Sequence, residues 1–283
     1  MKKGIFIIER FNGVSEFINT IAKRPVNTHF WSERDSLSSE TKDKEFTMTK
    51  NYAESEALMA SGYGEGLADL QKAGAFKVSR ATNATRHVPH ASVVGYAPHV
   101  PNAIAGIPQS MIDTTHIQQK SKIVTILYDG AASAYMDADK FVKAGRVLMS
   151  LIIKLEMQGY RVQLDILDAF CTPNEKALCM VTVKSHRHPI NPLKISYLLL
   201  HPSFFRRQGF RWLETQPETT FQYSGYGRPL RHSCPKGETP DAIRSYLAEN
   251  KVLESGVFYT SLYEALNHSP EELAEKMGIT IKK

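Results

Sequence analysis

The sequence predicts an α/β fold with a mostly parallel central sheet flanked by helices. Residues 123–128 have the pattern of a buried strand, a long amphipathic helix pattern follows, and residues 160–167 alternate as a second strand. This order is that of a right-handed strand–helix–strand unit, and further strand and helix patterns follow it. Over 283 residues, 42% are hydrophobic and 23% are charged, which is ordinary for a globular chain and excludes collagen-like or wholly disordered classes.

The N-terminal region, 1–80, is predicted to be mainly helical. Residues 5–8 form a short strand pattern, and Phe17 and Ile21, four residues apart, share one face of a helix that follows. Residues 25–46 are polar and predict an exposed loop. Residues 48–74 return to helical spacing and are interrupted by glycines, so they predict two short helices.

Residues 81–120 are predicted to form an extended proline-rich connecting segment. Four prolines fall within residues 89–108. Proline fixes its own φ angle and biases the residue before it towards extended backbone. The apolar residues among these prolines suggest that the segment covers a sheet edge. It divides the N-terminal region from an α/β core domain at 121–283.

The core domain begins with its clearest unit. The run 123–128 is β-branched and apolar, as a central strand requires. Asp137 and Asp139 favour the start of a helix because carboxylates complement the helix dipole there. That helix is predicted to end before Gly159, and the strand at 160–167 follows it.

The rest of the core is predicted to mix strands and helices. Thr239 before Pro240, and Ser269 before Pro270, have the N-cap and first-turn residues typical of helix starts. In chain order, the elements are a strand at 177–183, an apolar segment at 193–200, a short helix after Ser203, a weaker strand at 221–223, a helix after Thr239, a strand at 257–260 and a helix after Ser269.

The net charge of +6 is concentrated in one stretch of the chain. Between Glu175 and Glu214 there is no acidic residue. If they share one face, these cations create a positive field that attracts nucleic acid, phosphates or an acidic protein. The alternative is that acidic residues from elsewhere in the fold pair with them. The seven cations of the stretch are Lys176, Lys184, Arg187, Lys194, Arg206, Arg207 and Arg211.

Residues 201–214 are the densest binding candidate because three arginines alternate with aromatic residues. Arginine binds phosphates and carboxylates through its planar fork, and aromatic side chains stack on bases. The alternative is an amphipathic helix with its aromatics in the core and its arginines outside. The predicted partner or nucleic-acid binding residues are Lys184, Arg187, Arg206, Arg207, Arg211, Phe205 and Trp212.

A second candidate site lies at the end of the strand at 123–128. Ligands of open α/β sheets bind at the carboxyl ends of strands, and oxygen ligands from Asp129 and Ser133 suit a hard cation. This stretch resembles the Asp-x-Ser-x-Ser motif of von Willebrand factor A domains, with Ala131 in place of the middle serine. The resemblance implies a von Willebrand A-like or Rossmann-like core and Mg²⁺ at Asp129 and Ser133. The alternative is that Asp129 only ends the strand and caps a turn.

Other chemistries have little support in the sequence. It contains no Cys-x-x-Cys, no His-Glu-x-x-His and no Gly-x-Ser-x-Gly motif, so zinc and serine-hydrolase sites are not expected. Three cysteines predict a reducing compartment rather than a disulfide framework. No apolar run is long enough to cross a membrane, so a membrane partner is not expected.

Three segments together resemble an uncharacterised protein family of tailed bacteriophages. They are residues 52–62, residues 95–112 (Gly-Tyr-Ala-Pro-His-Val-Pro-Asn-Ala-Ile-Ala-Gly-Ile-Pro-Gln-Ser-Met-Ile) and residues 201–214. The similarity spans residues 12–265. It implies a phage origin and a location in the cytoplasm of the bacterial host, with the virion as the alternative. It supplies no catalytic residues.

These observations favour a phage-encoded binding or assembly protein that engages a protein partner of the virion or host, rather than an enzyme. One alternative is a nucleic-acid-binding protein that uses the basic aromatic segment at 184–212. A second is a metal-dependent hydrolase at Asp129, with Mg²⁺ as its cofactor. These hypotheses differ in what they require of the named side chains: exposure for binding, and a ligand set for the metal.

Overall fold

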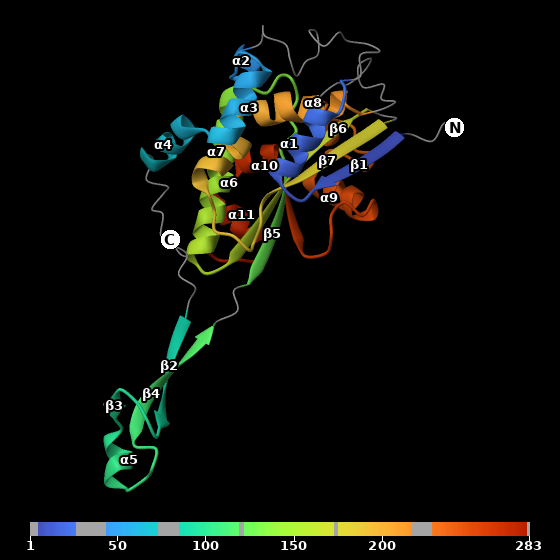
Figure 1. Cartoon of the computed structure of the whole chain (residues 1–283). Coiled ribbons are helices and arrows are strands. Elements are labelled where there is room, and N and C mark those ends of the chain that lie inside the picture. Colours follow the sequence, from blue (N-terminus) through green and yellow to red (C-terminus); the bar gives the residue numbers. More distant parts are fainter. Residues whose placement is uncertain are drawn as a thin grey trace. The chain divides into compact units, whose positions relative to one another are not determined.

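The computed structural model describes residues 5–26, 44–72, 85–118, 122–172, 175–216 and 228–281 (Figure 1). The chain forms two compact units. The larger unit combines Met1–Lys77 with Ile123–Lys283, and the smaller unit is Val78–Lys122. Most of the loop predicted at 25–46, and the strand predicted at 221–223, lie outside the described residues.

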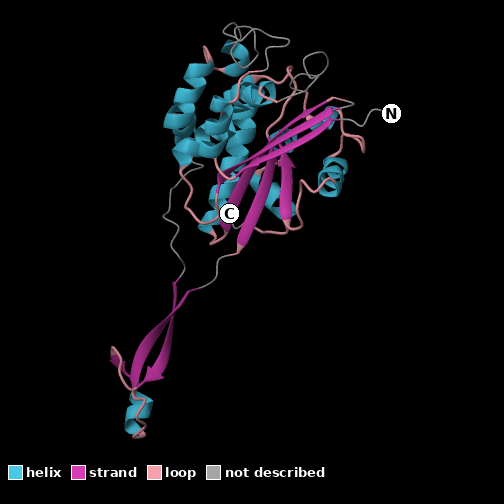
Figure 2. Ribbon diagram, turned by 45° about the vertical axis from the view of Figure 1, so that its right-hand side comes forward, coloured by secondary structure: helices cyan, strands magenta, loops and turns pink. Residues whose placement is uncertain are grey.

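The larger unit is built on a mixed five-stranded sheet with the order β1-β7-β6-β5-β8 (Figure 2). Three neighbouring pairs are parallel, and only β6 and β7 are antiparallel. The predicted class, α/β with a mostly parallel sheet flanked by helices, is therefore confirmed. The strands are β1 (Ile5–Phe11), β5 (Ile123–Asp129), β6 (Arg161–Cys171), β7 (Glu175–Lys184) and β8 (Val257–Ser261).

The predicted strand–helix–strand unit is present as β5, α6 (Ala138–Met157) and β6. β5 and β6 are parallel, with Ile126 opposite Leu164. The helix ends before Gly159, which adopts a φ of +86° that glycine tolerates better than other residues. Local pattern was sufficient here because each element carries its own periodicity and its own end signal.

Two apolar layers cover the two faces of the sheet. Ile126 belongs to one buried cluster and its neighbour Leu127 to the other, because successive strand side chains point to opposite faces. α9 (Pro240–Glu249) and η2 (Leu230–His232) pack in the second cluster, on the side opposite α6 and α7 (Figure 1). The helices that contribute to the first are α1 (Val14–Lys23), α3 (Tyr52–Ser61), α4 (Gly64–Lys72), α6, α7 (Pro192–Leu200), α8 (Phe210–Glu214), α10 (Leu262–Asn267) and α11 (Pro270–Lys276).

The residues predicted as a separate N-terminal region are part of the larger unit instead. β1 pairs with β7, placing Ile8 opposite Leu178. Phe17 of α1 is buried in the main core, and Glu9 of β1 accepts a 2.7 Å hydrogen bond from Trp212. The physical reason is that a strand needs a partner for its backbone hydrogen bonds, and among the described residues β1 finds that partner in β7.

The helix-start signals in the second half of the chain are confirmed. The Thr239 hydroxyl accepts a hydrogen bond from the backbone N–H of Ala242 at 3.2 Å. Ser269 and Glu272 form a reciprocal capping box at the start of α11. No helix among the described residues is long and apolar enough to cross a membrane.

The smaller unit is a twisted antiparallel hairpin rather than the extended connecting segment that was predicted. β2 (Thr85–Ser92) pairs with β4 (Met111–Gln118), and β3 (Ala97–Pro98) pairs with the start of β4. A short helix, α5 (Val100–Ile104), follows β3. The extended backbone that the prolines favour is present, but its strands pair with each other within this unit.

Candidate functional site

Asp129 lies at the carboxyl end of β5, as predicted, and its carboxyl group is enclosed by the protein. One oxygen accepts a hydrogen bond from the backbone N–H of Ala131 at 3.1 Å, and the other accepts one from the Tyr259 hydroxyl at 3.0 Å. Burial raises the pKa of Asp129 to about 7. Asp129 is therefore the last residue of the strand, and its side chain caps the turn that follows, as the alternative hypothesis held.

Ser133, the second predicted ligand, takes part in hydrogen bonds of the loop that follows β5. Its hydroxyl accepts a hydrogen bond from the backbone N–H of Tyr135 at 3.3 Å, and its own N–H donates to the Tyr263 hydroxyl. The neighbouring strand β8 ends at Ser261, whose hydroxyl caps α10. Within the described part of the chain, no group of three or more His, Cys, Asp or Glu side chains is arranged to hold a metal ion. The Mg²⁺ site that the motif implied at Asp129 and Ser133 stays a prediction, and both Asp129 oxygens already accept hydrogen bonds within the protein.

A second buried carboxyl, Asp168 on β6, was missed by the sequence reasoning. Its side chain is 1% exposed, and neither oxygen has a hydrogen-bond partner among the described residues. A methyl group added at Gly209 would lie 2.9 Å from one of these oxygens, so the carboxyl would have to shift. Burial, reinforced by Asp129, raises the pKa of Asp168 well above its ordinary value. The available signal was an acidic residue inside the apolar run at 166–171.

We expect Asp129 to make stability fall as the pH rises. A carboxyl whose folded pKa is raised contributes stability that is complete below the unfolded pKa of 3.8 and is lost as the pH passes through about 7. Between pH 4 and 8, the free energy of unfolding of the wild type should therefore fall by on the order of 2–4 kcal/mol more than that of Asp129→Asn. The variant should accordingly show a flatter dependence of Tm on pH. Calorimetry at several pH values measures this, with the exposed Asp137→Asn as control; matching slopes in both variants would contradict it.

The basic aromatic segment is buried, which corrects the expectation of a solvent-facing surface. Residues 204–209 form a π-helix, and both of its arginines are fully buried. Arg207 donates to the Thr49 hydroxyl at 2.5 Å, to the Thr47 hydroxyl at 3.0 Å and to the Thr49 carbonyl at 2.9 Å. Arg206 donates to backbone carbonyls, including that of Phe46 at 2.6 Å. These arginines fix residues 46–49 to the core.

The aromatic residues of the segment also belong to the core. Phe205 and Trp212 each stack with Phe170, with ring centroids 5.4 Å and 6.1 Å from that of Phe170. The alternative hypothesis, an amphipathic helix, is correct in that the aromatic residues are in the core. It is wrong in that Arg206 and Arg207 are buried with them instead of facing the solvent.

The remaining predicted binding residues do not form one surface. Lys184 is buried, donates to the Val162 carbonyl at 2.7 Å and pairs with Glu156 at 2.5 Å. Arg211 is half-buried above the ring of Tyr52. Only Arg187 among the predicted residues is exposed. The charge of Lys184 is neutralised by Glu156 of α6. For this residue, the alternative hypothesis, that acidic residues from elsewhere in the fold pair with the cations, is correct.

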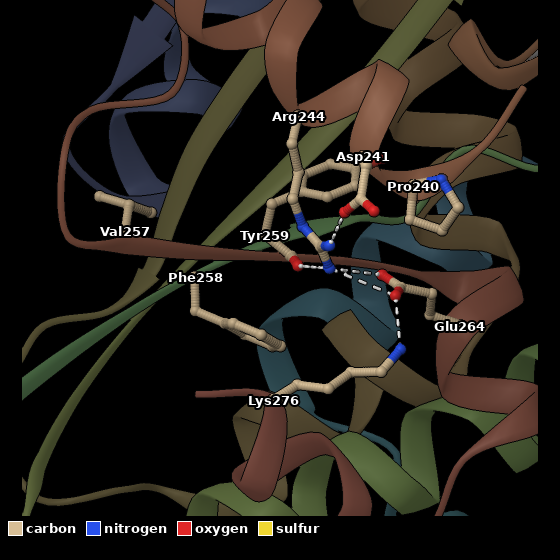
Figure 3. Close-up of a pocket in the computed structure, with 8 residues that line it drawn as sticks. All are labelled: Pro240, Asp241, Arg244, Val257, Phe258, Tyr259, Glu264 and Lys276. Carbon is tan, nitrogen blue, oxygen red and sulfur yellow. Dashed lines mark hydrogen bonds and ion pairs between the residues drawn. The ribbon is translucent and has the colours of Figure 1, made fainter. Parts of the chain in front are cut away.

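An open pocket of about 500 Å³ lies beside β8 and was not predicted (Figure 3). Arg244 of α9 is its central residue: it donates to the Tyr259 carbonyl at 3.1 Å and to the Glu264 carboxylate at 3.2 and 3.3 Å. Lys276 of α11 binds the same carboxylate at 3.0 Å. In sequence these are ordinary surface-type residues that are dispersed along the chain, so no local motif marks the site.

The exposed large apolar side chains of the described chain are most concentrated in the smaller unit, within residues 93–107. Of the twelve exposed large hydrophobic residues of the described chain, six fall in these fifteen positions. Ile104 is 83% exposed. No formally charged side chain occurs between Arg86 and Asp113. We call this surface the apolar tip; it consists of Val93, Val94, Tyr96, Val100, Ile104 and Ile107.

The backbone of the apolar tip is held by hydrogen bonds rather than by a core. The N–H of Tyr96 donates to the Ile112 carbonyl at 2.9 Å, and that of His99 donates to the Ser110 carbonyl at 2.7 Å. The Asn102 side chain donates to the Gln109 carbonyl at 2.8 Å. A methyl group added at Gly95 would lie 2.1 Å from the Ile112 carbonyl oxygen, so only glycine allows this close approach.

The comparisons with known proteins locate the chain in one family. A family model described as a domain of unknown function (DUF7192) matches residues 5–266. No curated protein and no solved structure matches the chain.

Proposed function

Because the chain belongs to the DUF7192 family of domains of unknown function, we propose its function from its own surface: it is a binding or assembly protein that engages a protein partner through the apolar tip. The observation that carries this proposal is the concentration of exposed apolar side chains in residues 93–107. Contiguous apolar patches on soluble proteins mark interaction sites, whereas isolated exposed hydrophobic residues need no explanation.

Order in the apolar tip supports a binding role. Backbone hydrogen bonds fix the loop before β3 and the turn after α5 although the apolar side chains there bury little surface. A surface that is ordered before binding loses less conformational entropy on association, which increases affinity. The tip also includes Tyr96, a residue type enriched at interface centres.

The absence of charge between Arg86 and Asp113 indicates what kind of partner fits. Without charged groups, the tip gains little from electrostatic attraction, so affinity has to come from removal of apolar surface from water. The complementary partner surface is an apolar groove on a protein. Nucleic-acid binding would need exposed cations, and the predicted ones are mostly buried.

The phage origin and the von Willebrand A-like core are part of the same proposal. Support for the core comes from the parallel β5, α6 and β6 unit with Asp129 at the end of β5. The phage origin rests on the resemblance of residues 52–62, 95–112 and 201–214. The partner is accordingly a virion protein or a host protein.

Site-specific photo-crosslinking tests the proposal directly. A photoreactive phenylalanine analogue replaces Tyr96 in one variant and Tyr135, a 94% exposed tyrosine of the larger unit, in a matched control. After irradiation in infected bacterial cells and in mature virions, the Tyr96 position should yield a discrete protein adduct that resists nuclease. No adduct, or the same adducts from both positions, would refute the proposal.

We also expect Gly95→Ala to weaken partner binding without unfolding the larger unit. The added methyl group meets the Ile112 carbonyl oxygen at 2.1 Å, so the loop that carries Tyr96 has to move. Gly64→Ala, where a methyl group meets nothing within 4 Å, is the control. Adduct yield at Tyr96 should fall at least tenfold in Gly95→Ala alone, with Tm of both variants measured in parallel; an unchanged yield would show that tip order is irrelevant.

A further inference from the structure

The pocket beside β8 runs along the edge of the sheet. Among the described strands, β8 ends the sheet order and pairs only with β5. Three consecutive residues of β8, Val257, Phe258 and Tyr259, line the pocket. Consecutive strand side chains point to opposite faces, so a pocket that touches all three lies at the strand's edge rather than over one face.

Arg244 occupies the position on this edge that a neighbouring strand would use. Its Nη2 donates to the Tyr259 carbonyl at 3.1 Å, where a paired strand would place a backbone N–H (Figure 3). Side-chain protection of this kind keeps edge strands from uncontrolled pairing. Arg244 is in turn held by Glu264, which is buried, and by Asp241, whose side chain is 90% exposed at the rim.

The pocket keeps donors available for a negatively charged ligand. Arg244 has five N–H groups, and its Nε has no hydrogen-bond partner among the described residues. Lys276 makes a single ion pair, with Glu264, and its side chain is 38% exposed. Phe258 adds an apolar ring beside these two cations. The combination suits a ligand with a carboxylate, a backbone that can donate to the strand, and an apolar side chain.

We propose that this groove binds an extended peptide segment that carries a carboxylate and adds to β8 as a further strand. A backbone N–H of the peptide would donate to the Tyr259 carbonyl in place of Arg244, as in β-strand addition. The freed Arg244 fork and Lys276 would bind the peptide carboxylate, which displaces Asp241 from Arg244. This site is independent of the apolar tip, which belongs to the other unit.

A defined peptide provides the probe. Fluorescence anisotropy of the full-length protein would be measured with a labelled peptide of alternating threonine and valine that ends in glutamate with a free carboxylate. Two matched probes share its length: one ends in glutamine amide, and one has N-methylated backbone amides that cannot donate to a strand. We expect saturable binding of the first probe, with both matched probes at least tenfold weaker.

Variants then assign the binding to the groove. Lys276→Gln should weaken the first probe at least fivefold while Arg244 still holds Glu264, and Asp241→Asn should tighten it about threefold by removing the competing carboxylate. Lys140→Gln, which breaks an exposed ion pair with Asp137, is the control and should change nothing. Charge-balanced Arg244→Gln/Glu264→Gln avoids an unpaired buried carboxylate and should abolish binding.

Hydrogen exchange at residues 257–261 reports strand addition separately, because a peptide bound through ion pairs alone would not protect the backbone amides of β8. Amide protection there should rise when the glutamate probe is added. The proposal is overturned if the wild-type protein shows no saturable binding, if all three probes bind equally, or if Lys276→Gln and the charge-balanced variant bind as the wild type does. Crosslinking at Tyr96 is unaffected by any of these results, so the two proposals fail separately.

Discussion

Replacing Arg207 by alanine should lower the free energy of unfolding by about 3–5 kcal/mol, the range for removal of one partner from a buried charged network. The guanidinium is fully buried and donates to Thr47 and Thr49, on a segment far away in sequence. Alanine removes the charged donor from these buried oxygens and opens a cavity in a packed core. Urea denaturation measures the loss, and the exposed Arg187→Ala is the matched control, with a change below about 0.5 kcal/mol.

Arg207→Lys separates the geometry of the guanidinium from its charge. Lysine keeps the positive charge, but it has no planar fork that could reach the Thr49 hydroxyl and carbonyl together. We expect it to lose at least half of the stability that alanine loses. If Arg207→Lys were as stable as the wild type, hydrogen-bond geometry would not be what anchors residues 47–49. If Arg207→Ala were as stable, the segment would not depend on this arginine.

Local pattern predicted those parts of the fold whose signals lie within one element. The helix α6 with Gly159 after it, and the caps at Thr239 and Ser269, follow from short-range spacing and backbone chemistry. The pairing of β1 with β7 joins residues about 170 positions apart, such as Ile8 and Leu178, and no local signal specifies that contact.

The candidate sites were harder to predict because exposure is a property of the whole fold. Arg206 and Arg207 resemble surface arginines in sequence, and only the distant carbonyls and hydroxyls of residues 46–49 make their burial tolerable. Residues 93–107 resemble a covered segment because apolar residues are usually buried. Asp129 was correctly placed at a strand end, but its enclosure by Tyr259 comes from a strand 130 residues later.

The second large effect is expected at the apolar tip. We consider a variant in which Tyr96, just before β3, and Val100 and Ile104 of α5 are all replaced by serine. This variant should bind the partner at least a hundredfold more weakly. Central apolar anchors contribute about 2 kcal/mol or more each to an interface, so the loss of three is enough to lower the affinity by more than a hundredfold. The folded state should tolerate the change, because these side chains are exposed and contribute little to the core.

The affinity of the crosslinked partner, once purified, for full-length protein tests the central claim most directly. Calorimetric titration would compare the wild type, the Tyr96→Ser/Val100→Ser/Ile104→Ser variant and a control, Tyr135→Ser/Met157→Ser, that removes exposed apolar side chains from the larger unit. The account predicts that the tip variant loses at least a hundredfold in affinity, while the control binds like the wild type and all three have similar Tm values. Equal affinity of the tip variant and the wild type would contradict it.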